Sequence, residues 1–361
     1  MVEDILRNIM LREKQLIWQR LKDEKKPIVM YGMGNGAQKI FDICTEYGIT
    51  ICDIFASDGF VRGHSFLGYE IISYSQVCEK YNDCIVLLAF AVHSHEMFCK
   101  IKEIAEKYEV LVPDVPVCGT DILTFERLKS EKVLVHKAFD LLSDDMSRAV
   151  FKNIIEFKLS GKPKYLFEIE TARHEVFQNL LKLSDKETYV DLGAYNGDTV
   201  REFLETTRNR FESIIAVEPD PKNYKKLSKL EQVGTDMRIE IHNKAAWNYE
   251  TTLNFSCDGG RNSHIRFTGT PVETVSVDRL LDGRRASYIK IDVEGSEFEA
   301  LDGAKNTILK FAPKLAVSAY HHTVDFYKLV VYINSLNPDY KVFLRHHPYI
   351  PAWETNIYAT L

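Results

Sequence analysis

A short apolar run that breaks into a glycine-containing turn constrains this chain of 361 residues more than any other feature. Residues Thr188 to Leu192 have the apolar pattern of a buried parallel strand, and Gly193 and Gly197 lie in the turn that follows. A helix is expected next, and a second apolar run, Ile214 to Val217, ends in Glu218. This order is typical of a nucleotide-binding half-fold, in which the acid accepts hydrogen bonds from ribose hydroxyls.

The first strand also carries an acid, Asp191, two residues before the glycine. A carboxylate at this place would repel a pyrophosphate. It suits S-adenosylmethionine, because that molecule carries a sulfonium and an amino group. The phosphate loop G-x-x-x-x-G-K-[ST] is absent from this turn. We therefore predict a methyl-donor site that binds S-adenosylmethionine.

Two further carboxylates follow a later apolar run. Residues Ser287 to Asp292 have the pattern of a strand, and Glu294 follows two residues later, so both acids lie on one side of an extended segment. Ligands of open α/β sheets bind outside the carboxyl ends of the strands. Together with Asp191 and Glu218, these acids would gather at one rim of the sheet. Solvated acids at a capped strand end are the alternative interpretation.

The pattern of strands and helices divides the chain into three segments. We expect a Rossmann-like α/β domain at residues 1–120, a helical linker at 121–184 and the donor-binding domain at 185–361. The first domain is expected to begin with an amphipathic helix over residues 1–25. Residues 248–280 alternate in polarity and are expected to form a β-rich insertion.

Composition excludes several classes of protein. The net charge is −6 and no arginine-rich or lysine-rich patch stands out, so we expect no nucleic-acid partner. No apolar run approaches the length of about 20 residues that crosses a bilayer, so we expect no membrane span. The charged N-terminus argues against a signal peptide, and we expect a cytoplasmic protein.

Five motifs in the second half of the chain resemble those of FkbM-type S-adenosylmethionine-dependent methyltransferases. They begin at Tyr189, Val217, Asn243, Val275 and Tyr288. The resemblance covers roughly residues 165–361 and implies a class I methyltransferase fold, with a seven-stranded sheet whose last strand is antiparallel. It also implies methylation of an oxygen, usually on a sugar or a polyketide. We expect an O-methyltransferase that acts on a sugar hydroxyl in polysaccharide or glycan-precursor synthesis, with a small-molecule or nucleotide-linked sugar as its substrate.

By position, the resemblance also implies which residues hold the donor. Those that would line the turn at its methionine part are Asp191, Gly193, Ala194, Asn196 and Gly197. Glu218 would hold the ribose, with Pro219 and Asp220 beside the adenosine. Ala245 or Ala246 would border the adenine, and Asp292 would close the site.

Methylation of a hydroxyl is helped by a base near the acceptor oxygen. The candidates are His321, His322 and Glu294. Family members often carry a glutamate and a histidine after strand five, and this chain departs from that pattern with Ala319-Tyr-His-His322. A histidine pair that leaves a strand also fits a packing or capping role. His264, in a glycine-containing segment, would cover the acceptor if that loop closes over it. An ordinary hairpin loop is the interpretation that we prefer.

A metal ion is the alternative to a base. Asp292, Glu294 and His321 would supply oxygen and nitrogen ligands, but their spacing is not diagnostic. The seven cysteines contain no C-x-x-C pair, which disfavours zinc. We expect no metal.

A second glycine turn lies near the N-terminus, where Gly32, Gly34 and Gly36 follow an apolar run and Asp58 lies about where a ribose-binding acid is expected. This region resembles the N-terminal domain of bacterial sugar O-acyltransferases, which implies a docking site for a nucleotide-linked sugar. A scaffold for oligomerisation, such as a homodimer, is the alternative.

Two other functions stay open. One is an NAD(P)-dependent oxidoreductase or epimerase that uses the turn at Gly32, although no Tyr-x-x-x-Lys pair follows it at a useful distance. The other is a non-catalytic nucleotide-sugar binding protein.

Overall fold

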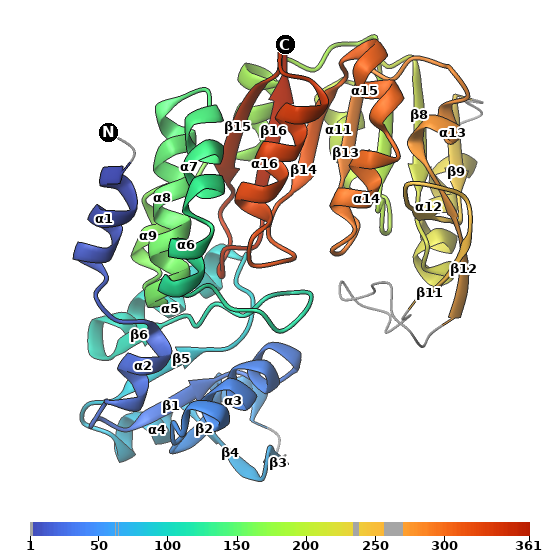
Figure 1. Cartoon of the computed structure of the whole chain (residues 1–361). Coiled ribbons are helices and arrows are strands. Elements are labelled where there is room, and N and C mark those ends of the chain that lie inside the picture. Colours follow the sequence, from blue (N-terminus) through green and yellow to red (C-terminus); the bar gives the residue numbers. More distant parts are fainter. Residues whose placement is uncertain (1–2, 62, 64, 234–237, 256–269) are drawn as a thin grey trace.

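The computed structural model describes residues 3–61, 63, 65–233, 238–255 and 270–361. Two large β-sheets dominate it, the N-terminal sheet in the lower part of Figure 1 and the C-terminal sheet in the upper part. A group of helices lies beside the upper sheet. The mixed α/β fold class that the sequence predicts is therefore confirmed.

The N-terminal sheet has six strands in the order β3-β4-β2-β1-β5-β6. Its neighbouring strands are parallel except for β3 and β4. Strand β1, in the interior of this sheet, is buried along its whole length, as expected for a parallel sheet with both faces covered. The strands are β1 (Ile28–Tyr31), β2 (Asp53–Ala56), β3 (Ser65–Phe66), β4 (Tyr69–Ser73), β5 (Ile85–Leu88) and β6 (Glu109–Leu111). The helices between them are α3 (Asn35–Tyr47), α4 (Tyr74–Lys80) and α5 (His95–Lys107), with a 3-10 turn at Asp58–Phe60.

The leading helix differs from the expectation of one helix over residues 1–25. Two helices are present, α1 (Glu3–Arg12) and α2 (Ile17–Lys22). Helix α1 contacts α8 (Asp145–Ser160) and α2 contacts α3, so the two helices pack against different parts of the chain. Glu13 lies at the break, where its buried carboxylate is 2.8 Å from Nζ of Lys162.

The helical segment between the sheets packs along the outer strand of the C-terminal sheet, β15 (Lys341–His346). The N–H of Val342 donates to Oγ of Ser143 at 2.9 Å, and the N–H of Leu344 donates to Oγ of Ser147 at 3.0 Å. These hydroxyls satisfy the donors of an edge strand that would otherwise be open to pairing. The remaining helices of the segment are α6 (Phe125–Ser130), α7 (Lys132–Leu141), α9 (Lys164–Phe167), α10 (Arg173–Glu175) and the π-helix Val176–Leu180.

The C-terminal sheet has seven strands in the order β15-β16-β14-β13-β7-β8-β9. The last strand of the chain is antiparallel to both of its neighbours, as the sequence predicts. The other strands of this sheet are β7 (Thr188–Leu192), β8 (Ser213–Val217), β9 (Ile239–His242), β13 (Tyr288–Ile291), β14 (Lys314–Ser318) and β16 (Thr355–Thr360). Its helices are α11 (Asp198–Thr206), α12 (Pro221–Val233), α14 (Glu297–Asp302), α15 (Lys305–Phe311) and α16 (Asp325–Leu336).

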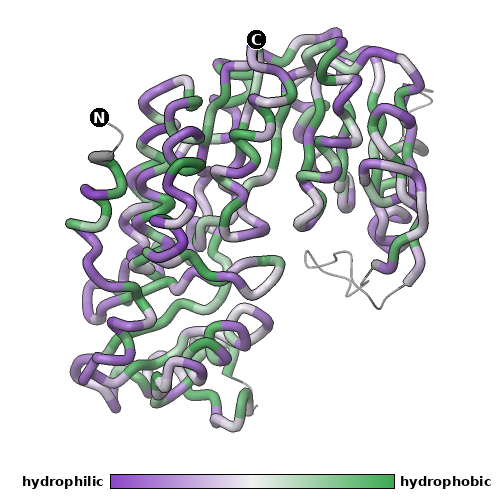
Figure 2. The backbone as a smooth tube through the Cα atoms, viewed as in Figure 1, coloured by the Kyte–Doolittle hydropathy of each residue, from purple (hydrophilic) through white to green (hydrophobic). Residues whose placement is uncertain are grey.

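Both faces of this sheet are buried. Val190 and Ile289 belong to one hydrophobic cluster, whereas Tyr189 and Tyr288, their neighbours in sequence, belong to another. This alternation places the two clusters on opposite faces. Figure 2 shows hydrophobic stretches along the strands and hydrophilic stretches on the outer helices. No helix among the described residues is long and apolar enough to cross a membrane.

A small third sheet carries the predicted β-rich insertion, in the order β10-β12-β11. It consists of β10 (Ala245–Ala246), β11 (Thr252–Phe255) and β12 (Thr270–Val275), and α13 (Val277–Leu281) follows it. Residues 256–269, which include His264, lie outside the described residues.

The N-terminal part touches the C-terminal sheet through its loops. Val92 forms a backbone bridge with Ile350, and the N–H of Val112 donates to the carbonyl of Gly161 at 2.7 Å. The N–H of Cys118 donates to the carbonyl of His321 at 2.9 Å. The segment that follows the first sheet therefore reaches the rim of the second one.

Candidate active site

The turn after β7 brings the backbone of Gly193 against a neighbouring strand end. A Cβ on Gly193 would lie 1.8 Å from the carbonyl oxygen of Asp292, and its φ is +76°, so the turn requires glycine. The N–H groups of Gly193 and Ala194 both donate to the carbonyl of Val217 at 3.0 Å. The turn therefore holds the ends of β7, β8 and β13 together at one rim.

The acid at the end of β8 is held by the backbone. Glu218 accepts hydrogen bonds from the N–H of Tyr195 at 2.8 Å and from the N–H of Asp220 at 2.9 Å. Burial raises the pKa of Glu218 to about 7, against the effect of these two donors. Its carboxylate thus lies at a fixed place on the rim and would gain from further hydrogen-bond donors on a ligand.

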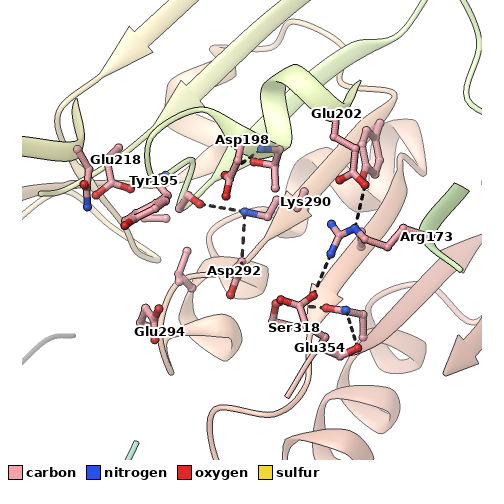
Figure 3. A pocket seen from close by; sticks show the side chains of 18 of the residues that line it. Arg173, Tyr195, Asp198, Glu202, Glu218, Lys290, Asp292, Glu294, Ser318 and Glu354 are labelled. Atoms are coloured by element: carbon pink, nitrogen blue, oxygen red, sulfur yellow. Dashed lines mark hydrogen bonds and ion pairs between the residues drawn. The ribbon is translucent and has the colours of Figure 1, made fainter. Parts of the chain in front are cut away.

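A cavity of about 500 Å³ opens at this rim. Figure 3 shows Glu218 and Tyr195 at one end, Lys290 and Asp292 in the middle, and Arg173 and Glu354 at the other end. Of the residues that the sequence predicts for the site, those that line this cavity are Gly193, Glu218, Pro219, Ala245, Ala246, Asp292 and Glu294.

Asp191 lies behind the cavity wall and is fully buried. Its carboxylate accepts a hydrogen bond from Oγ1 of Thr199 at 2.6 Å and lies 3.1 Å from Nζ of Lys290. The same ammonium donates to the carbonyl of Gly193 at 2.9 Å. Asp191 thus fixes the lysine and the glycine turn.

Lys290 lines the cavity, and the sequence analysis assigned it no role. It occupies the middle of β13, between two fully buried isoleucines. A lysine in the interior of an otherwise apolar strand was the signal that could have identified it, because a buried ammonium requires carboxylate partners.

Two acids follow β13, and their pKa values are shifted in opposite directions. Burial would raise the pKa of Asp292, but the charges of Lys290 and His321 outweigh it and hold that pKa below the usual value. Burial raises the pKa of Glu294, although His321 opposes the rise. Asp292 is therefore a stable anion in this cavity, whereas Glu294 takes up a proton more readily.

The loop that carries Glu294 is strained and anchored. Glu294 has a φ of +52°, a left-handed conformation that is unfavourable for this residue type. The thiol of Cys118 donates to its carbonyl at 3.2 Å, and Nε2 of His322 lies 3.1 Å from the carbonyl of Gly295. Residues far away in sequence therefore hold the backbone of this loop, and Glu294 lines the cavity.

His321 is buried behind these acids. Its Nδ1 lies 2.9 Å from Oε1 of Glu297, and its Nε2 lies 3.3 Å from Oε2 of Glu294 and 3.5 Å from Oδ1 of Asp292. Burial lowers the pKa of His321, but the carboxylates of Glu297 and Glu294 outweigh it and raise that pKa well above the usual value. A protonated His321 at this place partly neutralises the negative charge of the surrounding carboxylates.

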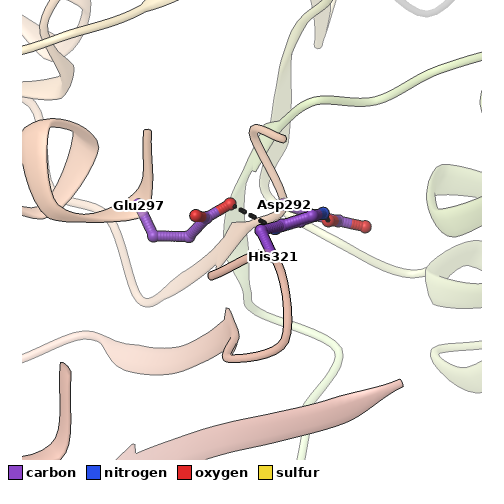
Figure 4. A group of neighbouring side chains, drawn as sticks. All are labelled: Asp292, Glu297 and His321. Atoms are coloured by element: carbon purple, nitrogen blue, oxygen red, sulfur yellow. Dashed lines mark ion pairs between the residues drawn. The ribbon is translucent and has the colours of Figure 1, made fainter. Parts of the chain in front are cut away.

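Asp292, Glu297 and His321 are also close enough together to be considered as metal ligands. Figure 4 shows the carboxylates of Glu297 and Asp292 on opposite sides of the imidazole ring. They face different ring nitrogens, whereas a histidine gives one nitrogen to a metal ion. The arrangement fits an imidazolium between two carboxylates better than a shared cation.

The other predicted residues lie around the cavity without lining it. His322 is half-buried and borders a separate cavity with Cys118 and Glu297. Asn196 accepts a hydrogen bond from Arg201 at 3.1 Å. The remaining three predicted residues are buried in the protein interior: Ala194, Gly197 and Asp220.

The residues at the end of the cavity opposite Glu218 were not predicted from the sequence. Arg173 donates from Nε to Glu202 at 3.0 Å and from Nη1 to Glu354 at 2.9 Å. Three non-glycine residues with positive φ line the cavity: Tyr195, Glu294 and Glu354. Such conformations gather at functional sites, but no local motif reveals them in a sequence.

The N-terminal glycine turn has a different environment. Among the described residues, no atom lies within 4 Å of a Cβ placed on Gly34, whereas Gly32 and Gly36 pack against Phe90 and Ala89. Asp58 accepts hydrogen bonds from the N–H of Ser75 at 3.2 Å and from its Oγ at 2.8 Å. The predicted ribose-binding acid is therefore engaged at the first turn of α4, and nucleotide binding at this turn stays a prediction.

The fold and the cavity define the class of the C-terminal part. The sheet order with its antiparallel last strand is that of the Rossmann-like methyltransferases, and the cavity lies at the carboxyl ends of the central strands, where ligands of such sheets bind. Residues 191–350 match the family described as "Methyltransferase FkbM domain". This part of the chain is an FkbM methyltransferase domain, as the resemblance predicts.

A solved structure agrees with this fold. The chain is similar to a methyltransferase FkbM from Methylobacillus flagellatus KT, with 23% identity over 98% of this chain and 93% of that chain and a TM-score of 0.71. Fibrillarin from Aeropyrum pernix, solved with natively bound S-adenosyl-L-methionine, has 11% identity over 52% of this chain and 73% of that chain, with a TM-score of 0.34. The second similarity is too low to carry an argument. No curated protein matches the chain.

Proposed function

We propose that the chain is an S-adenosylmethionine-dependent O-methyltransferase whose acceptor is a sugar hydroxyl. The observation that carries this proposal is the order of groups along one cavity. Glu218 lies at one end, Asp292 lies in the middle, and Glu294 lies below Tyr195 in Figure 3. The first group suits a ribose, and the other two suit a methyl transfer from a cationic sulfur.

The cavity has the groups that S-adenosylmethionine requires. Glu218 would accept hydrogen bonds from the ribose hydroxyls, and Ala245 and Ala246 would border the adenine. The open backbone of Gly193 and the anion of Asp292 would face the amino group and the sulfonium. The attraction between these charges favours the cationic donor, since the cavity wall is partly shielded from water.

The bound donor would supply an electrophilic methyl group, whose bond to the sulfonium sulfur breaks so that the donor leaves as a neutral thioether, and the protein must remove a proton from the acceptor. We assign this step to Glu294, because it lines the cavity and the other two base candidates do not. Its carboxylate would take the hydroxyl proton as the acceptor oxygen forms its bond to the methyl carbon. The raised pKa of Glu294 brings it closer to the pH at which such a base works best.

The surroundings of Glu294 support this assignment. The imidazole of His321 lies 3.3 Å from its carboxylate and would hold it in place without touching the acceptor. Lys290 neutralises Asp191 rather than Glu294, since its Nζ lies 3.1 Å from Asp191. Glu294 therefore keeps a carboxylate oxygen for the acceptor.

The wider role that we propose is the modification of polysaccharide or glycan precursors in the cytoplasm. The N-terminal domain, which we place at residues 1–120, would then be available for a nucleotide-linked sugar or for dimer formation.

Calorimetry with S-adenosylmethionine tests the donor, with NAD as the control ligand. We expect micromolar binding of S-adenosylmethionine and none of NAD, and binding of NAD alone would contradict the proposal. Acceptors are tested by incubation with S-adenosylmethionine and a panel of nucleotide-linked hexoses, followed by mass spectrometry and cleavage analysis that separates O-methylation from N-methylation.

A further inference from the structure

The end of the cavity away from Glu218 is built by three separate parts of the chain. Arg173 comes from α10, Glu202 from α11, and Glu354 precedes β16 (Figure 3). Ser318 and Asn356 extend this group along the sheet, with Oγ of Ser318 lying 3.3 Å from Oδ1 of Asn356. Nothing assigned so far to donor binding or to proton removal lies in this end.

The group is fixed before any ligand binds. The N–H of Thr171 donates to the carbonyl of His346 at 2.8 Å, and Nδ1 of His347 lies 2.7 Å from the carbonyl of Thr171. Nε2 of His347 lies 2.7 Å from the hydroxyl of Tyr358, which lines the cavity. These contacts tie Thr171, two residues before Arg173, to the end of β15 and through His347 to β16, so the protein itself holds the chain next to Arg173 in place.

The chemistry of this end excludes anions and favours hydroxyls. The guanidinium of Arg173 already faces the carboxylates of Glu202 and Glu354, so the three groups together carry a net charge of about −1 by simple charge counting. A phosphate or carboxylate would add to that negative charge. Hydroxyl groups can donate to the carboxylates and accept from the guanidinium, Ser318 and Asn356.

The cavity wall is partly apolar. Tyr288, Ala316 and Tyr358 line the cavity from adjacent strands, and each exposes less than a tenth of its surface. Aromatic rings beside carboxylates and amides suit a sugar ring, which has apolar C–H faces and hydroxyls around its edge.

We propose that this end is the acceptor subsite and that it takes a neutral, polyhydroxylated ring, while any phosphate of a nucleotide-linked sugar lies outside the cavity. This inference rests on the proposed function. Arg173, Glu202 and Glu354 are then specificity residues that select hydroxyl groups and reject anions.

The test uses the full chain saturated with S-adenosylhomocysteine and titrated with glucose, galactose, mannose and their 6-phosphates, observed by saturation-transfer NMR. At least one neutral hexose is expected to give a signal, and its 6-phosphate is expected to give at most a tenth of it. Glu202→Gln is expected to lower the hexose signal at least fivefold. The matched control Glu212→Gln, an exposed carboxylate just before β8, is expected to leave it unchanged.

Calorimetry with S-adenosylhomocysteine separates the failures. If the wild-type chain does not bind it, the proposed function fails. If it binds but no neutral hexose gives a signal, or Glu202→Gln has no effect, only the subsite inference is overturned. A loss of more than tenfold in S-adenosylhomocysteine affinity in Arg173→Lys, with folding verified by circular dichroism, would also overturn it, because this end would then hold the methionine part of the donor.

Discussion

The molecule contains two glycine turns that follow buried parallel strands, and they have different surroundings. The turn at Gly193 lies beside Glu218, a buried carboxylate that faces a cavity. The turn at Gly32 has Asp58 as its counterpart, but that acid is exposed and bound to Ser75. The glycine pattern therefore permits a close approach of a ligand, whereas the acid on the next strand and the space around it decide which turn becomes a site.

The acids that follow the neighbouring strand also differ between the two turns. Next to β7, strand β13 ends at Ile291 and leads to Asp292 and Glu294, which both line the cavity. Next to β1, strand β5 leads to the exposed Glu96 on α5. We infer that methyl transfer uses the second turn alone, so changes at that turn should affect activity more than matched changes at the first turn.

Replacement of Glu294 should lower kcat more than any other change considered. Glu294→Gln should lower kcat by about 10³-fold, because the acceptor hydroxyl loses its base. Donor affinity should stay within twofold of the wild type. Glu96→Gln is the matched change at the other turn and should leave kcat unchanged. Steady-state kinetics with isotope-labelled donor measure both, and equal rates for the two variants would remove Glu294 from its role.

The next effect is on donor affinity. Glu218→Ala should weaken S-adenosylmethionine binding by about 10²-fold, because two hydrogen bonds to a charged group are lost. Asp58→Ala should change it by less than twofold. Calorimetry measures both dissociation constants, and a larger loss in Asp58→Ala would move the donor to the first turn.

The free energy of unfolding should also differ between alanine variants of the two turns. Gly34 and Gly193 both have positive φ, so alanine should cost about 1–3 kcal/mol at each. Only at Gly193 would the new Cβ meet backbone, 1.8 Å from the carbonyl oxygen of Asp292. Gly193→Ala should therefore cost about 1–3 kcal/mol more than Gly34→Ala. Urea unfolding of both variants measures the difference, and equal losses would show that the close approach is not a constraint.

The smallest effect is a pH dependence of donor binding. The pKa of Glu218 is about 7, and only its ionised form accepts both ribose hydrogen bonds. Affinity should therefore be full above that pH and fall by roughly tenfold for each pH unit well below it. Ser75 holds the pKa of Asp58 below its usual value, so a ligand bound there would show no such fall above pH of about 5.

Calorimetry between pH 5.5 and 8.5 measures this dependence, and Glu218→Gln is its control. The variant should bind weakly with a smaller pH dependence, since the carboxylate no longer titrates. A wild-type profile that matches the variant would contradict the assignment of Glu218.

The features that the sequence predicts well are those carried by contiguous residues. The strand, turn and acid at Thr188 to Glu218 lie within one stretch, and the strand that ends in Asp292 has its own apolar pattern. Each could be placed on the sheet because parallel strands present their carboxyl ends at one rim. The seven-stranded sheet with its antiparallel last strand was implied by the family resemblance, and the rim at which the acids gather followed from these segments.

The features that were missed arise from distant contacts. Arg173 and Glu354 meet although 181 positions separate them, and neither belongs to a local motif. His321 and His322 are neighbours in sequence, yet only the folded chain shows that one is fully buried behind the acids and the other borders a different cavity. Side-chain direction and burial decide such roles, and they depend on packing rather than on spacing.

A crystal structure of the chain with S-adenosylhomocysteine would show which of the two turns binds the donor. Density is expected in the cavity of the C-terminal domain, with the ribose hydroxyls within hydrogen-bond distance of Glu218 and the sulfur between Gly193 and Asp292. Density at the turn of Gly32, or a ribose that does not contact Glu218, would contradict the account.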